Sequence, residues 1–317
     1  MNIISGFTLT QYQHPVRKYI RSVVKNWRLY VFLAPAIVYF IVFAYMPMYG
    51  VQLAFKELSM RAGITASPWV DPLFKHFITF FESRKFFEVI WNTLYLNLYG
   101  LAAGFPIPII LAILLNELRS VRYRKIVQNV TYAPYFISVV VLVGMINLFF
   151  SNRGIVNQFL DFLNRDTVMF LQQGSYFPHL FIWSGVWQGM GYSSIIYFAA
   201  LSGVPPELQE AAVIDGASRL QRIWHIKLTH IRPTIIILLI LNCAYMLSFG
   251  FEKVYLMQNA LNIQYSEVIT TYIFKLGIGQ RNFGLASAVG LFQNVINLII
   301  MLSVNWVAKK TSDIGLV

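Results

Sequence analysis

The residues best suited to chemistry lie in the segment 202–232, whose pattern is too regular for a simple connector. Glu210 and Asp215 could pair with Arg or Lys side chains of another protein, or could accept hydrogen bonds from backbone amides. Ala211 and Ala212 lie between them and present almost no side chain, so another surface can approach closely. The pattern therefore indicates a contact with a partner.

A short helix is predicted to position these side chains. Pro205 and Pro206 suit a first helical turn, and Glu207 complements the positive end of the helix dipole. The helix can run to about Ile214, because Gly216 can take the left-handed conformation that ends a helix.

A second, amphipathic helix is predicted to follow the turn. Its apolar stripe has helical spacing and consists of Leu220, Ile223, Trp224 and Leu228. Two short helices at an angle, over about 203–230, would form a knob that fits a cleft on a soluble partner. The alternative is an interfacial pair of helices that lies on a bilayer surface.

Signatures of enzymes are absent from the sequence. The chain has no GxxxxGK[ST] phosphate loop, no HExxH motif and no GxSxG motif. His225 and His230 do not share a helix face, and Cys243 is the single cysteine. We therefore expect no catalytic residue, no internal disulfide, and no metal or cofactor bound by this chain.

Composition indicates a membrane protein. Of 317 residues, 57% are apolar and only 12% are charged, which is about half the usual charged share of a soluble domain. The mean hydropathy of +0.59 argues against a soluble enzyme, a disordered chain or a disulfide scaffold. The formal net charge of +12 is best explained by basic cytoplasmic loops, since no basic, aromatic-interleaved segment that could bind nucleic acid is found.

Six stretches contain no Asp, Glu, Lys or Arg and are long enough to cross a bilayer. They lie near 30–49, 93–115, 127–150, 177–201, 233–251 and 284–307. Backbone groups in lipid must hydrogen-bond internally, so each span should be a helix and the fold class is all-α integral membrane. Prolines within the spans, among them Pro35 and Pro134, predict kinks.

Lys and Arg residues set the predicted orientation. Five precede the first apolar run at Leu29, and four lie in each of the segments 116–126 and 202–232, against two each in 151–176 and 257–283. Both termini and the segment 202–232 should therefore face the cytoplasm. The first apolar run is too long for a cleavable signal and should be an uncleaved span. We expect a membrane domain over 30–310 between a tail at 1–29 and a tail at 311–317.

The segment 202–232 also resembles a known family. Glu210-Ala211-Ala212, Asp215-Gly216-Ala217, Ile226 and Leu228 are similar to the EAA motif of the permease subunits of binding-protein-dependent ABC importers. The chain departs from this motif in having Thr229 where the family usually has a proline.

The resemblance extends over most of residues 30–307. Within the family, the chain is similar to the oligosaccharide and polysaccharide branch, and in that branch it resembles the permeases of alginate-oligosaccharide importers. The resemblance is carried by Met46-Pro47-Met48-Tyr49-Gly50, Ala54-Phe55-Lys56, Asn92-Thr93-Leu94, Asn116-Glu117-Leu118, Ala133-Pro134-Tyr135-Phe136-Ile137-Ser138 and Ile196-Tyr197.

The resemblance implies a type I ABC importer permease fold with six transmembrane helices and cytoplasmic coupling helices. It implies a second permease subunit, usually a different chain, in the bacterial inner membrane. Two copies of an ATPase, which hold ATP and Mg, would lie on the cytoplasmic side, and an extracytoplasmic binding protein would deliver a carbohydrate. Residues 210–217 would contact the ATPase, and this chain would hydrolyse nothing.

A path for sugar needs aromatic faces and neutral hydrogen-bonding groups rather than buried charge. The predicted spans offer such residues: Trp183, Trp187, Gln188, Tyr192, Asn242, Tyr245, Asn294 and Asn297. Tryptophans that anchor at interfaces and amides that join helices are the ordinary alternative. No buried Arg or Lys is expected to pair with a carboxylated sugar, so other subunits would supply most of the recognition of a uronate.

Two other classes of protein remain open on the sequence. A stand-alone carrier or channel would match the six spans but leaves the knob at 205–228 unexplained and has no membrane carboxylates to use. An integral-membrane transferase would need paired acidic residues or a histidine cluster near one membrane face, and acidic residues are sparse everywhere.

Overall fold

The computed structural model describes residues 25–248 and 250–312. This part of the chain is helical, and its only β-type pairing is an isolated bridge between Lys56 and Trp69. The prediction of an all-α fold is therefore confirmed. The chain divides into two compact units, Met1–Gln52 and Leu53–Val317, which are described separately below.

The first unit contains the first predicted span. Helix α2 (Trp27–Phe40) continues through a π-helical turn (Ile41–Tyr45) into α3 (Met46–Met48). The helical run over Trp27–Phe55 is 29 residues long and apolar enough to cross a membrane. None of the α2 residues is buried, so its apolar side chains are available for contact with lipid or with protein.

In the second unit, α6 (Lys85–Gly104) and α7 (Pro106–Glu117) form the longest candidate span. Together they extend over 33 residues. At about 1.5 Å per residue such a helix exceeds the roughly 30 Å hydrocarbon core, so its ends reach beyond it. The predicted span at 93–115 lies inside this helix.

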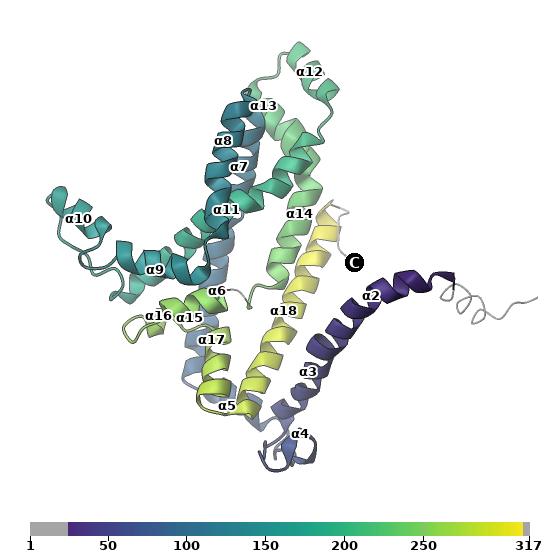
Figure 1. Ribbon diagram of the computed structural model, residues 1–317, viewed down its shortest axis with the longest axis vertical. Coiled ribbons are helices and arrows are strands. Elements are labelled where there is room, and N and C mark those ends of the chain that lie inside the picture. The colour runs from purple at the N-terminus through teal and green to yellow at the C-terminus, as the bar shows by residue number, and fades with distance from the viewer. Residues whose placement is uncertain (1–24, 249, 313–317) are drawn as a thin grey trace, which may run out of the picture. The chain divides into compact units, whose positions relative to one another are not determined.

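Helix α11 (Phe177–Ser202) packs against α6, α7 and α14 (Figure 1). Its bounds match the predicted span at 177–201 to within one residue. One apolar cluster on it contains Phe177 and Phe181, and a second contains Tyr197 and Leu201. Side chains from several other helices contact both clusters, so α11 forms much of the core of this unit.

The span predicted at 127–150 is not one helix: it is interrupted at Pro134, where the sequence predicts a kink. The structure has α8 (Val121–Tyr132), a 3-10 turn (Ala133–Phe136) and α9 (Val139–Phe149) instead. The two arms meet at 97°. Ser138 caps α9, with its Oγ accepting a hydrogen bond from the Val141 amide at 3.3 Å. Because the new helix begins with its own cap, the chain can turn here without leaving that end unsatisfied.

The boundary between the predicted knob and the fifth span is wrong. Helix α13 (Arg219–Arg222), a π-helical turn (Ile223–Lys227) and α14 (Leu228–Ala244) form one continuous helix of 26 residues. The amphipathic helix predicted after the turn is therefore the first part of this span. The helix also ends at Ala244, so residues 245–248 are not part of a helix as the predicted span at 233–251 requires.

Helix α18 (Phe283–Ser312) contains the predicted span at 284–307 and packs against α14 and α17 (Ile269–Phe274). Four helices of the described chain are long and apolar enough to cross a membrane, or five if the bent pair α8–α9 counts as one span. Helix α11 has the length but is not among them, so the predicted number of six is not reached on length and composition.

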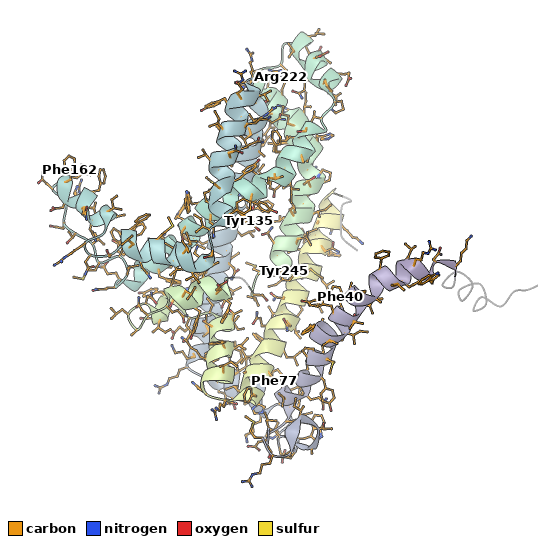
Figure 2. All side chains as sticks on the ribbon, viewed as in Figure 1. Phe40, Phe77, Tyr135, Phe162, Arg222 and Tyr245 are labelled. Carbon is orange, nitrogen blue, oxygen red and sulfur yellow. The ribbon has the colours of Figure 1, made fainter. Side chains whose placement is uncertain are left out.

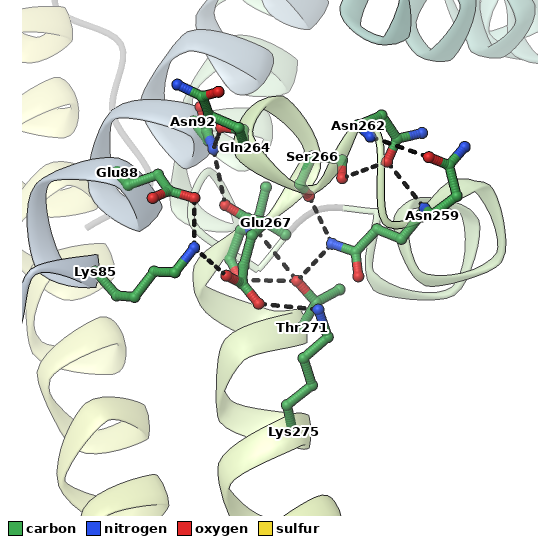
Figure 3. Close-up of polar contacts among 12 residues, drawn as sticks. Lys85, Glu88, Asn92, Asn259, Asn262, Gln264, Ser266, Glu267, Thr271 and Lys275 are labelled. Carbon is green, nitrogen blue, oxygen red and sulfur yellow. Dashed lines mark hydrogen bonds and ion pairs between the residues drawn. The ribbon is translucent and has the colours of Figure 1, made fainter. Parts of the chain in front are cut away.

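Short elements connect these helices: α4 (Gly63–Ala66), α5 (Lys75–Glu82), α10 (Ile155–Phe162), α12 (Pro206–Ile214), α15 (Phe251–Met257) and α16 (Ile263–Ser266). Glu267 lies between Lys85 at 3.1 Å and Lys275 at 2.9 Å (Figure 3). We call these three residues the Glu267 clamp. Asn92 donates to the backbone oxygens of Gln264 and Glu267, which ties α6 to the same loop.

Candidate coupling surface and internal cavity

The predicted short helix and its turn are confirmed. Helix α12 runs over Pro206–Ile214 with Glu207 in its first turn, and Gly216 has a φ of 77°. The Gly216 amide donates to the Val213 oxygen, and the Ala217 amide donates to the Ala212 oxygen. This pair of bonds is the Schellman arrangement that ends a helix, and it fixes the direction in which the chain leaves α12.

A capping box begins the next helix, in addition to the turn predicted from the sequence. The Ser218 amide donates to the Gln221 side chain at 2.7 Å, and the Gln221 amide donates to Ser218 Oγ at 3.4 Å. Ser and Gln at this spacing are the sequence signal for such a box. Both sides of the turn at Asp215 and Gly216 are thus fixed by local hydrogen bonds.

The structure separates the predicted motif residues into two groups. Glu210, Ala211, Asp215 and Gly216 are exposed, whereas Ala212 and Ala217 are half-buried on the same turn. Ile226 and Leu228 are half-buried on the following long helix, where Leu228 packs against the cluster of Ala112, Tyr197, Leu201 and Ile231. Residues 210–217 therefore form one accessible surface, whereas the last two positions of the motif connect to the core.

A carboxylate on α7 holds the long helix that follows this surface. Arg219 Nε lies 2.5 Å from Glu117 Oε2, and Arg219 Nη2 donates to the Glu117 backbone oxygen at 3.1 Å. Lys227 forms an ion pair with the same carboxylate and donates to Asn116 Oδ1 at 2.6 Å. We call Glu117, Arg219 and Lys227 the Glu117 clamp. It joins the helix after the exposed surface to α7.

The second unit contains an open cavity of about 1010 Å³. It is lined by α6, α7, α11, the bend before α9, and the residues around the end of α14. Its polar lining residues include Asn97, Tyr135, Ser138, Gln188, Ser193, Tyr197, Asn242, Tyr245, Glu252 and Lys253. Aromatic rings together with amides and hydroxyls can bind a neutral polar solute such as a sugar. Tyr135 and Tyr245 are labelled in Figure 2.

Three of the eight predicted path residues line this cavity: Gln188, Asn242 and Tyr245. Gln188 donates to the Ile137 oxygen at 2.7 Å, which supports the bend before α9. Asn242 donates to the Leu238 oxygen of its own helix, and Tyr245 is 69% exposed.

The other five lie outside the cavity lining: Trp183, Trp187, Tyr192, Asn294 and Asn297. Trp183 donates to the Tyr99 hydroxyl at 2.8 Å. Tyr192 stacks on the cavity residue Tyr135 with ring centroids 3.8 Å apart. Trp187 and Asn294 are exposed. A role of these five residues in the path of the solute stays a prediction. Tyr192 lies next to the cavity, because it stacks on Tyr135.

Asn297 supports the interruption after α14. Its Oδ1 accepts from the Leu247 amide at 3.0 Å and its Nδ2 donates to Ser248 Oγ at 3.0 Å. Gln293 donates to the Leu247 oxygen and to Ser248 Oγ. Non-helical backbone at this depth needs such partners, because neither lipid nor an adjacent helical turn supplies them.

The expectation that no buried Lys or Arg is available is wrong. Lys253 lines the cavity and is 9% exposed. The sequence does not indicate this, because the predicted fifth span ends at 251 and Lys253 therefore falls in a loop. The interruption after α14 brings α15 inward instead. Gly250 has a φ of 76°, and a Cβ there would lie 2.8 Å from the Phe181 ring, so only glycine fits this turn.

No metal centre is evident in the described part of the chain, where no three His, Cys, Asp or Glu side chains come together to hold an ion. The features that remain are an apolar helical body, an exposed paired-helix surface and a polar-lined cavity. Together they define a membrane transport subunit.

The chain belongs to the family described as binding-protein-dependent transport system inner membrane component, whose pattern matches residues 104–313. It is 40% identical over 289 residues to Protein LplB of Bacillus subtilis (strain 168), covering 91% of this chain and 90% of that one. It is 38% identical over 301 residues to the polygalacturonan/rhamnogalacturonan transport system permease protein YteP of the same organism, covering 95% and 93%.

Solved structures of a bacterial importer of the acidic polysaccharide alginate contain a chain with the same fold. That chain superimposes with a TM-score of 0.86 at 38% identity, covering 93% of this chain and 99% of its own length. One of these structures is a complex with a periplasmic protein bound to an alginate pentasaccharide. Fold, family and relatives agree that this chain is a permease subunit of an ABC importer.

Proposed function

We propose that this chain is the permease subunit of an ATP-driven importer for oligosaccharides, including oligosaccharides that contain uronate. The named cargoes of similar proteins, polygalacturonan or rhamnogalacturonan and alginate, support this class of cargo. The cavity supports it independently, because its lining combines aromatic rings, amides and hydroxyls, as a carbohydrate requires.

The proposed complex lies in the bacterial inner membrane with both termini of this chain in the cytoplasm. It contains a second permease subunit, an ATPase dimer that binds ATP and Mg, and an extracytoplasmic binding protein. A complex of the alginate importer with its periplasmic protein supports the last of these partners. The exposed apolar surface of α2 is consistent with a neighbour in the membrane.

We propose that this chain contacts the ATPase through the exposed surface 210–217. Helix α12 makes no extensive contact with other elements of the described chain, and Ile214 at its end is 86% exposed. Glu210 and Asp215 add two acidic groups to this surface, and neither has an ion-pair partner within the described residues. A soluble partner with basic groups would complement it.

The Glu117 clamp would transmit movement of the ATPase contact to the helices that line the cavity. Movement of 210–217 would pull on the long helix that begins at Arg219, which is tied to the end of α7. Helix α7 contributes Pro108 to the cavity lining. ATP-driven closure of the ATPase dimer would thus change the cavity through rigid-body movement of packed helices.

Glu210→Lys tests the proposal in the complete importer reconstituted in vesicles. We expect insertion and assembly to be unchanged, and stimulation of ATPase activity by sugar-loaded binding protein to fall at least about tenfold, since a charge is reversed at a protein contact. Glu82→Lys is the matched control, because it reverses an exposed charge at the end of α5.

Full stimulation in Glu210→Lys would contradict the coupling proposal. Uptake of solute by vesicles that contain the wild-type chain without any ATPase would favour the stand-alone carrier instead.

A further inference from the structure

Lys253 has an unusual environment within the cavity. Its Nζ donates to the Phe181 backbone oxygen at 2.7 Å and lies 4.9 Å from the centroid of the Phe181 ring. A Cβ at Gly185 would lie 3.2 Å from the same nitrogen. Because Gly185 has no side chain, a solute in the cavity can approach the Lys253 ammonium across the backbone of α11.

Three other buried or half-buried lysines of the described chain have acidic partners. Lys227 pairs with Glu117, and Lys85 and Lys275 pair with Glu267. Lys253 forms no ion pair within the described residues. An ammonium has three protons to donate, and one protein acceptor leaves two of them directed elsewhere.

Lys56 shows what a purely structural buried lysine looks like here. It is 3% exposed, and its Nζ lies 5.0 Å from the centroid of the Trp69 ring, an arrangement like that of Lys253 with Phe181. However, Lys56 donates to two backbone oxygens, those of Ile64 and Thr65 at 3.0 and 2.9 Å. It also lies outside the cavity lining.

The rest of the cavity lining offers no compensation for this charge. The one acidic lining residue, Glu252, is exposed and does not pair with Lys253. Adjacent positions on a helix point about 100° apart, so the two side chains diverge. A charge held away from water without a counter-ion is costly and marks a functional site whose partner must be supplied.

We propose that Lys253 is a cationic subsite that binds the carboxylate of a uronate residue as an acidic oligosaccharide passes through the cavity. This inference rests on the proposed function and adds a charge-selecting residue in this chain. The carboxylate would take the two remaining donor positions of the ammonium, and the Phe181 carbonyl would keep Nζ in place. Neutral sugars would leave the ammonium unpaired.

The experiment measures equilibrium binding of three probes to the assembled importer in nanodiscs, without binding protein or nucleotide. The probes are trigalacturonate, its fully methyl-esterified form, which has nearly the same shape without charge, and maltotriose. We expect the wild type to bind trigalacturonate at least about tenfold more tightly than the ester, since a hydrogen bond between charged groups has this magnitude. In Lys253→Gln the two should bind within about twofold of each other.

Lys253→Arg keeps the charge and should retain most of the preference for the acid. Lys56→Gln is the matched control and should leave the ratio of acid to ester binding unchanged. Equal weakening of all three probes in Lys253→Gln would show a structural role and overturn the inference. If that variant fails to assemble, the wild type alone decides, because equal binding of acid and ester would overturn the inference.

The inference and the proposed function fail in different ways. Binding of all three probes with no preference for the acid overturns the charge-selecting role of Lys253 and leaves a carbohydrate importer. Absence of binding of any probe, together with absence of uptake in the complete importer with its binding protein, overturns the proposed function and the inference with it.

Discussion

Two carboxylates of this chain are each held between two cations, and they serve different structures. The Glu267 clamp joins α6 to the loop before α17, within a dense set of hydrogen bonds (Figure 3). The Glu117 clamp joins α7 to the start of the long helix that follows the exposed surface 210–217. The Glu267 clamp holds a loop against the helix bundle. The Glu117 clamp connects the bundle to the surface 210–217, which makes few other contacts with it.

The burial of the two clamps is reversed. In the Glu267 clamp the acid is buried, at 7% side-chain exposure, and its cations Lys85 and Lys275 are 42% and 34% exposed. In the Glu117 clamp the cation Lys227 is the buried member, at 6%, and the acid is 17% exposed. Removing Glu117 therefore leaves the buried Lys227 ammonium without a carboxylate partner. Removing Glu267 leaves two more exposed cations, of which Lys85 keeps its ion pair with Glu88.

Replacing the two acids should give the largest difference between these regions. We expect Glu117→Gln to lower the free energy of unfolding by about 3–5 kcal/mol, because Lys227 keeps its charge in a buried site. Glu267→Gln should cost on the order of 1 kcal/mol, since its cations can turn into water. Unfolding of the purified complex by titration with SDS measures both.

Glu117→Gln should also reduce stimulation of the ATPase by loaded binding protein, whereas Glu267→Gln should retain it. Equal losses of stability and of stimulation in the two variants would mean that the clamps do not differ in the way their burial indicates.

Two glycines with left-handed backbone, Gly216 and Gly63, allow a matched test of the turn after α12 that removes no charge. Gly216 follows α12 and Gly63 begins α4 in the loop after Lys56; their φ angles are 77° and 71°, and a Cβ at either would meet nothing within 4 Å. Replacing either by Ala costs the same backbone energy, about 1–2 kcal/mol. We expect Gly216→Ala to lower stimulated ATPase activity about fivefold, the equivalent of about 1 kcal/mol.

Gly63→Ala serves as the control and should leave stimulated activity within about twofold of wild type. Should the two variants behave alike, the conformation of the turn at 215–216 would have no particular part in coupling.

Much of this fold could be predicted from charge and periodicity. The absence of charged residues located α11 and α18 closely, and the proline and glycine signals located α12 and its turn. These are local features, and each depends on residues within about one helix of chain.

Pro134 predicts a kink before α9, but the sequence does not predict the 97° angle there, the end of α14 or the long-range pairs. The bend before α9 and the end of α14 at Ala244 depend on hydrogen bonds from other helices, such as those of Gln188 and Asn297. In an uncharged run, the residue types do not indicate where side chains of other helices hydrogen-bond to the backbone. Glu117 and Arg219 are 102 residues apart, and Lys253 and Phe181 are 72 apart, so no local pattern links them.

The smallest effect is expected from the capping box at Ser218. Ser218→Ala removes one accepted hydrogen bond, the one from the Gln221 amide, and should cost about 1 kcal/mol of helix stability. Coupling should fall by less than in Gly216→Ala, because the Glu117 clamp still holds Arg219 in the first turn of the same helix. Stimulated ATPase activity measures this.

Ser120→Ala is the control for Ser218→Ala, since Ser120 caps α8 in the same way, outside the residues 205–228. It should reduce stability by a similar amount and leave stimulation unchanged. If Ser218→Ala reduced stimulation as strongly as Glu117→Gln, the first turn after the exposed surface would be held by its cap. In that case the ion pairs of the Glu117 clamp, which Ser218→Ala leaves in place, would not be enough to hold the helix for coupling. The Glu117 clamp would then only stabilise the helix bundle, as the Glu267 clamp does.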